Sequence, residues 1–164
     1  MIFDPVRICS ILNEESVDYV VVGGFAAVVH GSVLPTADVD VIPSREAANL
    51  DRLARALTRM NAMVRTSGDP VPVRLDGPFL AQMPVMLNLV TDHGDVDLLF
   101  APAGGLEGFR EWNAHAVVVE IAEGVTVHVG ALEDVIASKR AANRERDRMA
   151  LPYLESLRDQ LRGE

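Results

Sequence analysis

Apolar residues recur along this chain at two different spacings, and these spacings predict helices and strands in alternation. Apolar positions three and four residues apart predict amphipathic helices with a polar opposite face. The predicted helices cover residues 6–15, 44–60, 131–143 and 147–161, with shorter helical pieces at 25–30 and 106–112. Short apolar or alternating runs predict strands at residues 19–22, 37–42, 85–91, 95–100, 115–121 and 125–129.

Residues that favour helix starts and turns set the boundaries between these elements. Asp4 followed by Pro5 is typical of a helix N-cap with proline at the first helical position, and Ser44 is the predicted N-cap of the next long helix. The Glu-Gly pair at 123–124 predicts a hairpin turn. Residues 66–79 carry three prolines and two glycines and predict a loop. That loop is either a plain surface connection or one wall of a substrate pocket.

The order of these elements predicts an α/β (α+β) fold. A mixed β-sheet flanked by helices accounts for residues 19–130, and residues 131–162 form a helical C-terminal segment. At 164 residues, the chain has the length of one domain, residues 1–164.

Composition and charge narrow the possible classes of protein. The net charge is −9 and the pI is about 4.9, which disfavours a general nucleic-acid-binding surface. Any hold on RNA is therefore expected to be local, at the basic cluster of Lys139, Arg140, Arg144, Arg146 and Arg148.

The same composition gives expectations about location. No apolar run approaches the ~20 residues that span a membrane, and the N-terminus lacks the pattern of a secretory signal. The single cysteine, Cys9, lies among apolar residues and is expected in the core. A cytoplasmic location is the simplest expectation.

Residues 19–43 combine acidic residues and glycines in a pattern that suits a metal ion and a phosphate. Strand alternation places Asp38 and Asp40 on one face. Neighbouring carboxylates repel each other unless a cation lies between them, and their oxygens suit Mg²⁺. The pair Gly23-Gly24 supplies a turn whose backbone amides can approach a phosphate at the start of a helix.

This strand, glycine pair, short helix and acidic strand resemble the nucleotidyltransferase (polymerase-β-like) superfamily. The resemblance implies the nucleotidyltransferase fold, with Asp38 and Asp40 holding Mg²⁺ and Gly23-Gly24 holding the triphosphate of a nucleotide. A third carboxylate comes from a neighbouring strand in that family, and Asp97 matches its place. The alternative interpretation is a buried β-α-β element with an acidic face.

Asp97 and Ser32 each have two interpretations. Asp97 is either a metal ligand or general base, or an ordinary carboxylate at a strand edge. Ser32 either contacts phosphate or is a turn residue beside Gly31. The single histidines His115 and His128 have no Cys or His neighbour at ligand spacing and are expected to be ordinary polar residues.

A second, narrower resemblance lies in residues 138–154. This stretch is similar to the Lys-x₄-Arg-x-Lys-Asp motif of nucleotidyltransferases related to the AbiE-type toxins of bacterial toxin–antitoxin systems. Lys139, Arg144 and Asp147 match the motif, and Arg146 stands where Lys is usual. The resemblance implies that Lys139, Arg146 and Asp147 belong to the nucleotide site, with Lys139 offsetting charge on the pyrophosphate leaving group. A solvated basic helix is the alternative.

Together the two resemblances imply an enzyme of EC 2.7.7 type, with ATP or another NTP as substrate and a two-metal Mg²⁺ site. The expected acceptor is a hydroxyl of RNA (a tRNA-like end) or of a protein, and the expected partner is an antitoxin. Two alternatives remain. One is a catalytically degenerate binding module, favoured because Met149 and Ala150 stand where the family often has an acid. The other is a small-molecule (antibiotic) nucleotidyltransferase.

Overall fold

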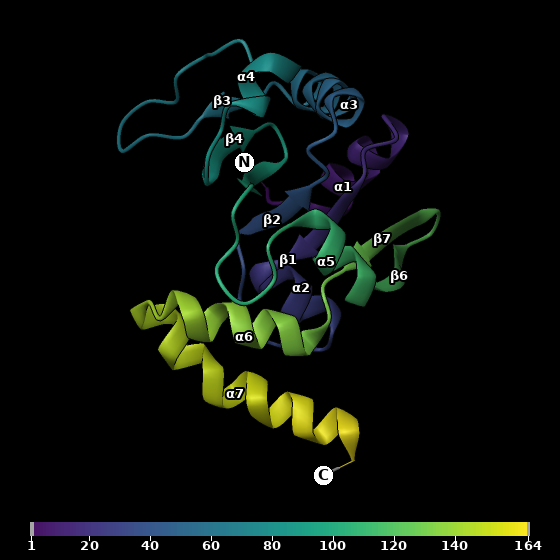
Figure 1. Ribbon diagram of the computed structural model, residues 1–164, viewed down its shortest axis with the longest axis vertical. Helices are drawn as coiled ribbons and strands as arrows, with labels where there is room; N and C mark the ends of the chain where they lie inside the picture. Colours follow the sequence, from purple (N-terminus) through teal and green to yellow (C-terminus); the bar gives the residue numbers. More distant parts are fainter. Residues whose placement is uncertain (1, 164) are drawn as a thin grey trace.

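The structure is a computed structural model that describes residues 2–163 (Figure 1). Helices and strands follow one another along the whole chain. Their order is α1 (Pro5–Glu14), β1 (Tyr19–Val22), α2 (Gly23–Val29), β2 (Asp38–Pro43), α3 (Ala47–Arg59), β3 (Met63–Val64), α4 (Gly77–Ala81), β4 (Met86–Thr91), β5 (Gly94–Leu99), α5 (Phe109–His115), β6 (Val117–Ala122), β7 (Val125–Val129), α6 (Leu132–Ala142) and α7 (Glu145–Arg162).

The strands form one mixed sheet with the order β3-β4-β5-β2-β1-β7-β6. Strands β2 and β5 run parallel, as do β1 and β7, and the other neighbours are antiparallel. The sheet centre is β2, between β5 and β1, so the acidic strand is hydrogen-bonded on both sides. The predicted mixed sheet flanked by helices is confirmed.

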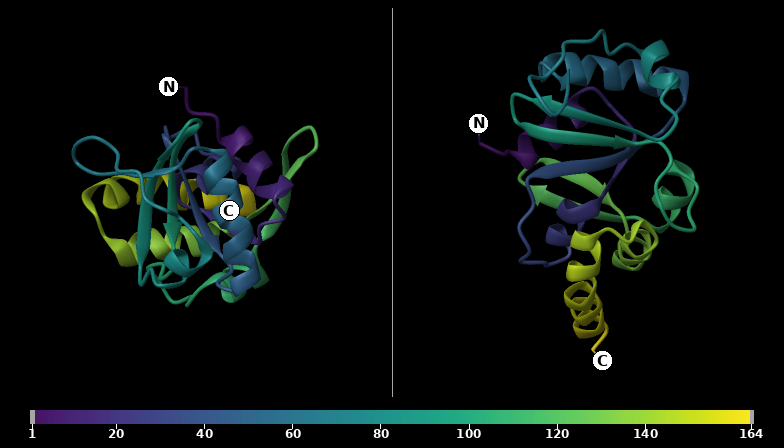
Figure 2. Two further views of the ribbon diagram at one scale, coloured as in Figure 1. Left: turned by 90° about the horizontal axis from the view of Figure 1, so that it is seen from above. Right: turned by 90° about the vertical axis from the view of Figure 1, so that its left-hand side faces the viewer.

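Helices α3 and α4 lie at one end of the molecule and α6 and α7 at the other, with the sheet between them (Figures 1 and 2). All four residues of β1 are buried, because this central strand is covered on both faces. On β2, Val39 and Val41 are fully buried, while the alternating Asp38 and Asp40 are only partly buried. The apolar face of β2 thus packs in the core and its acidic face remains accessible.

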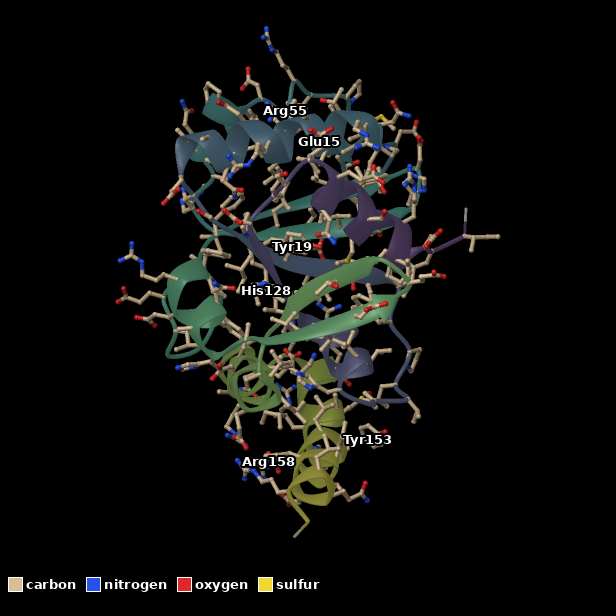
Figure 3. All side chains as sticks on the ribbon, turned by 90° about the vertical axis from the view of Figure 1, so that its right-hand side faces the viewer. Glu15, Tyr19, Arg55, His128, Tyr153 and Arg158 are labelled. Atoms are coloured by element: carbon tan, nitrogen blue, oxygen red, sulfur yellow. The ribbon has the colours of Figure 1, made fainter. Side chains whose placement is uncertain are left out.

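Helices α6 and α7 have a small core of their own. It consists of Ala27, Leu132, Ile136 and Leu154. Two side chains on α7, labelled in Figure 3, add polar ties: the Tyr153 hydroxyl accepts a hydrogen bond from the Val33 amide at 3.2 Å, and Arg158 lies 3.6 Å from Glu133. These contacts fix the C-terminal helices beside residues 27–33.

Several predicted boundaries are wrong. Helix α3 begins at Ala47 after Glu46, so Ser44 is not its N-cap; Ser44 is buried, and its carbonyl accepts a hydrogen bond from Asn49 Nδ2 at 2.8 Å. The predicted loop 66–79 contains the start of α4, capped by the Asp76 side chain. Strand β3 was not predicted, because a two-residue strand has no measurable periodicity.

Other local predictions are confirmed. Asp4 caps α1 by accepting a hydrogen bond from the Arg7 amide at 2.9 Å, and Pro5 is the first helical residue. Cys9 has no exposed surface, and burial raises the pKa of its thiol to about 12. Among the described residues, every helix is too short or too polar to cross a lipid bilayer.

Candidate functional site

Three aspartates from two neighbouring strands converge at the centre of the sheet. The parallel register places Asp40 of β2 opposite Asp97 of β5, and Asp38 opposite Asp95. Side chains at paired positions point to the same face of a sheet, so Asp38, Asp40 and Asp97 meet there. One oxygen from each lies within 4.8 Å of the others, and this is the one such convergence of potential metal ligands within residues 2–163. These three residues are called the acid trio below.

The acid trio is electrostatically unfavourable by itself. Burial raises the pKa of Asp40 to about 8, and the neighbouring carboxylates of Asp38 and Asp97 add to the rise. Burial also raises the pKa of Asp97, although Arg65 opposes this. One oxygen of Asp40, Oδ1, is buried and has no hydrogen-bond partner. A buried acceptor without a partner destabilises the fold, so the site favours an added cation or proton.

The carboxyl oxygens fit Mg²⁺ by their chemistry and their burial. Hard divalent cations prefer carboxylate oxygens, and an orphaned oxygen in a tight acidic cluster is an available ligand. Asp38, Asp40 and Asp97 are therefore the residues that could hold such an ion.

The glycine pair lies against the acid trio at the junction of β1 and α2. Gly23 has φ +69°, and a Cβ atom there would stand 2.9 Å from the carboxylate carbon of Asp40. A Cβ atom on Gly24 would stand 3.0 Å from the Thr36 hydroxyl. Both positions thus need glycine for close packing, and Gly23 also needs it for its backbone conformation. The expected turn is present, but the helix starts within it, at Gly23.

A cleft of about 340 Å³ runs from Asp38 and Asp40 of the acid trio to the C-terminal helices, and Asp97 lies behind these two acids and does not line it. Most predicted site residues line it. They are Gly23, Gly24, Ser32, Asp38, Asp40, Lys139 and Arg146, joined by Asp95 and Arg144. One wall is therefore acidic and belongs to the sheet, and the other is basic and belongs to residues 139–146. An anion with a bound metal ion would match both walls, because the metal ion would face the acidic wall and the anion would face the basic one.

Asp147 lies behind the basic wall. It has no exposed surface, accepts hydrogen bonds from the Arg144 amide at 3.1 Å and from Arg144 Nε at 2.7 Å, and lies 3.6 Å from Lys139 Nζ. Burial would raise the pKa of Asp147, but the hydrogen bonds and charge of Arg144 together hold it below its usual value. The buried carboxylate thus stays ionised and fixes two cations of the cleft.

Arg65, which the sequence did not single out, also touches the acid trio. Its Nη2 donates to Asp97 Oδ1 at 2.7 Å, and its Nη1 lies 3.1 Å from Asp95 Oδ2. Sequence patterns could not reveal it, because Arg65 directly follows the two-residue strand β3 and is far from Asp97 along the chain. Asn88 lies between them, opposite Asp97 on β4, and its Oδ1 is buried without a partner.

Other candidate residues lie away from the cleft. Of the loop 66–79, residues 73–76 line a second, more open hollow of about 780 Å³ beside α3, and none lines the cleft. His115 Nδ1 lies 2.9 Å from Asp134 Oδ2, and His128 Nδ1 lies 2.7 Å from Asn113 Oδ1. Figure 3 shows His128 at the side of the sheet, distant from α7.

Comparisons with known proteins agree with this architecture. No protein-family model matches the chain, and no curated protein matches its sequence. Among solved structures, it is similar to a protein of Thermotoga maritima provisionally assigned as a nucleotidyltransferase, with 18% identity, a TM-score of 0.52 and coverage of 96% of this chain and 90% of that one. It is also similar to the lincosamide antibiotic adenylyltransferase LnuA, solved with lincomycin bound, with 14% identity, a TM-score of 0.63 and coverage of 95% and 98%. The chain therefore has the nucleotidyltransferase fold.

Proposed function

We propose that this protein is a Mg²⁺-dependent nucleotidyltransferase that moves a nucleotide from an NTP to a hydroxyl acceptor. The observation that carries the proposal is the acid trio, whose oxygens converge within 4.8 Å and two of whose members, Asp38 and Asp40, line a cleft with a basic opposite wall. A structural cluster has no use for three mutually repelling carboxylates. A site that binds a metal and a triphosphate requires both walls.

Each residue has a role that follows from its place in the cleft. Asp38, Asp40 and Asp97 would hold the metal, which would supply positive charge to the triphosphate and the attacking hydroxyl. Gly23 and Gly24 let the main chain approach the phosphates.

The basic wall of the cleft is assigned to the pyrophosphate leaving group. Lys139 and Arg146 offset charge on the leaving pyrophosphate. The hydroxyl of Ser32 accepts a hydrogen bond from the Leu34 amide at 3.1 Å, so its own hydrogen is left to donate to a phosphate. Asp147 is buried behind Lys139 and Arg144, so we assign it the positioning of these cations in place of direct nucleotide contact.

The first candidate acceptor is a hydroxyl of a tRNA-like RNA or of a protein, as the resemblance to AbiE-type toxins implies, with an antitoxin as partner. The basic segment offers limited support for RNA. Arg140 lies 2.6 Å from Glu155, Arg144 is paired with Asp147, and Arg148 donates to the Asn143 carbonyl. Guanidinium groups already paired inside the protein contribute little to phosphate binding.

The second candidate acceptor is a small molecule with a hydroxyl group. It is favoured by the likeness to LnuA, an antibiotic adenylyltransferase that aligns over 98% of its length. The acidic overall charge of −9 also suits a neutral or cationic small molecule better than a nucleic acid.

The experiment is a transfer assay with Mg²⁺, each labelled NTP in turn, and three acceptor sets: total RNA, a protein extract and a panel of antibiotics that includes lincomycin. Asp38→Ala and Asp40→Ala should each lower transfer by at least about a hundredfold. Asp69→Ala, in an exposed loop, is the control and should transfer normally. Near-normal transfer by either trio variant would overturn the metal assignment. Nucleotide binding without transfer to any acceptor would favour the degenerate binding module.

A further inference from the structure

Arg65 reaches the acid trio from the far edge of the sheet. The β3–β4 ladder continues one step past Val64, where the Arg65 amide donates to the Asn88 carbonyl at 2.9 Å. Asn88 is the register partner of Asp97 on the next strand. The Arg65 side chain therefore crosses β4 to meet Asp97, and it is the sheet register that places it there.

The guanidinium pairs with Asp97 and with its neighbour Asp95. Nη2 donates to Asp97 Oδ1 at 2.7 Å, while Nη1 lies 3.1 Å from Asp95 Oδ2. The Asp97 side chain is 11% exposed and that of Arg65 is 29% exposed, so water screens this pair only weakly. An oxygen of the same carboxylate also lies within 4.8 Å of oxygens of Asp38 and Asp40. Asp97 is thus shared between a fixed cation and the place where a metal would bind.

This fixed cation changes the affinity of the acid trio for metal ions. An arginine stays protonated at every physiological pH, so its charge cannot be removed by the loss of a proton. It lies beside the acids and repels any divalent cation that shares Asp97 with it. The Arg65 charge should therefore weaken metal binding at the bare site.

We propose that Arg65 is a built-in counter-ion that keeps the affinity of the acid trio for a divalent cation low until a nucleotide is bound. The oxygens of a bound triphosphate would supply the missing negative charge for the metal, and Lys139 and Arg146 would hold the far end of that triphosphate. This inference rests on the proposed function, because it concerns the same metal site.

The test is calorimetric titration of the protein with Mn²⁺, with and without a non-hydrolysable ATP analogue. Without nucleotide, Arg65→Gln should bind Mn²⁺ about tenfold more tightly than the wild type, or better. Arg65→Lys keeps the charge and should stay close to the wild type. Arg52→Gln is the matched control, because Arg52 also pairs with an aspartate, Asp18, which lies just before β1 and away from the acid trio.

The outcomes separate the two proposals. Equal or weaker Mn²⁺ binding by Arg65→Gln overturns the counter-ion role, and weaker binding would show that Arg65 positions Asp97. Failure of the wild type and every variant to bind Mn²⁺, with or without the analogue, overturns the metal site and the proposed function with it.

Thermal melting checks that each variant folds, and Arg65→Met is a second neutral variant. If neither neutral variant folds, the effect of the analogue on Mn²⁺ binding by the wild type tests the inference. The analogue should tighten its Mn²⁺ binding at least about tenfold beyond the effect of the analogue in solution. Equal affinity of the wild type for Mn²⁺ with and without the analogue, after this correction, overturns the inference.

Discussion

The main chain of Gly23 lies directly against the side chain of Asp40. A Cβ atom at residue 23 would stand 2.9 Å from the carboxylate carbon and closer still to Oδ2. The end of β1 and the acid trio are therefore packed as one unit, because Val22 and Asp40 are also register partners. A side chain at residue 23 would have to displace the carboxylate.

Gly23→Ala should abolish metal binding. Its matched control is Gly124→Ala, since Gly124 has a similar φ of +74° but has open space where a Cβ atom would stand, with no neighbouring atom within 4 Å. Both variants bear the left-handed backbone cost of about 1–2 kcal/mol, and only Gly23→Ala moves Asp40. Mn²⁺ titration in the presence of the non-hydrolysable ATP analogue measures the metal effect, and thermal melting measures the backbone cost. If Gly23→Ala binds Mn²⁺ as well as Gly124→Ala does, the packing argument is wrong.

The metal-free protein should lose stability as the pH rises from about 4 to 8. The pKa of Asp40 is raised from 3.8 to about 8 in the fold, so the native state keeps a proton that the unfolded chain releases. The stabilisation contributed by protonated Asp40 is fully present below pH 4 and is lost as the pH rises toward 8. The effect is on the order of a few kcal/mol, since each pKa unit corresponds to about 1.4 kcal/mol.

Melting temperatures measured between pH 5 and 9 in EDTA test this dependence. Asp40→Asn removes the titrating group and should flatten the profile while it raises the melting temperature at pH 8. Added Mg²⁺ should stabilise the wild type most at the high end of the range. Parallel profiles for the wild type and Asp40→Asn would contradict the raised pKa.

Asp147→Ala should destabilise the protein by about 1–3 kcal/mol, because it removes the buried carboxylate that pairs with Lys139 and Arg144. It also removes the carboxylate that accepts a hydrogen bond from the Arg144 amide at the start of α7. Asp159→Ala is the control, since Asp159 is 42% exposed and pairs with Arg158 on the same helix. Urea unfolding should show less than about 1 kcal/mol for the control. Similar losses in both variants would mean that Asp147 is not a structural anchor.

Arg146→Gln should weaken ATP binding by about tenfold without changing the melting temperature. Arg146 is exposed and lines the cleft, and no carboxylate of residues 2–163 lies within ion-pair distance of it. Arg140→Gln, whose guanidinium pairs with Glu155, serves for comparison and should bind ATP normally. Fluorescence titration with a labelled ATP analogue gives both affinities. Equal weakening by the two substitutions would indicate a general charge effect.

The acidic half of the site could be predicted because strand alternation is a local property. Asp38 and Asp40 two residues apart must share a face, and a second acidic strand offered Asp97 as a partner. The register that pairs Asp40 with Asp97 depends on long-range packing, and no local pattern gives it.

The parts that were missed have the same cause. Strand β3 exists because it pairs with β4 and with Val71, and nothing in Met63-Val64 alone favours a strand. Without that strand, the sequence shows Arg65 only as a polar residue before a loop. Ser44 is a plausible cap by type, but its amide donates to the Asp18 carbonyl and its carbonyl accepts from Asn49, so the helix begins after it.

Residues 64–71 form a loop that projects from the edge of the sheet and is closed at its base by the bridge between Val64 and Val71 (Figure 1). Arg65 stands at its base, while the tip lies beyond every strand that carries the acid trio. Insertions or deletions at this tip would leave the trio in place and would alter only how firmly the arginine is anchored. Evolution could therefore retune the ion requirement of such a protein through the length of one peripheral loop, with every acidic ligand kept.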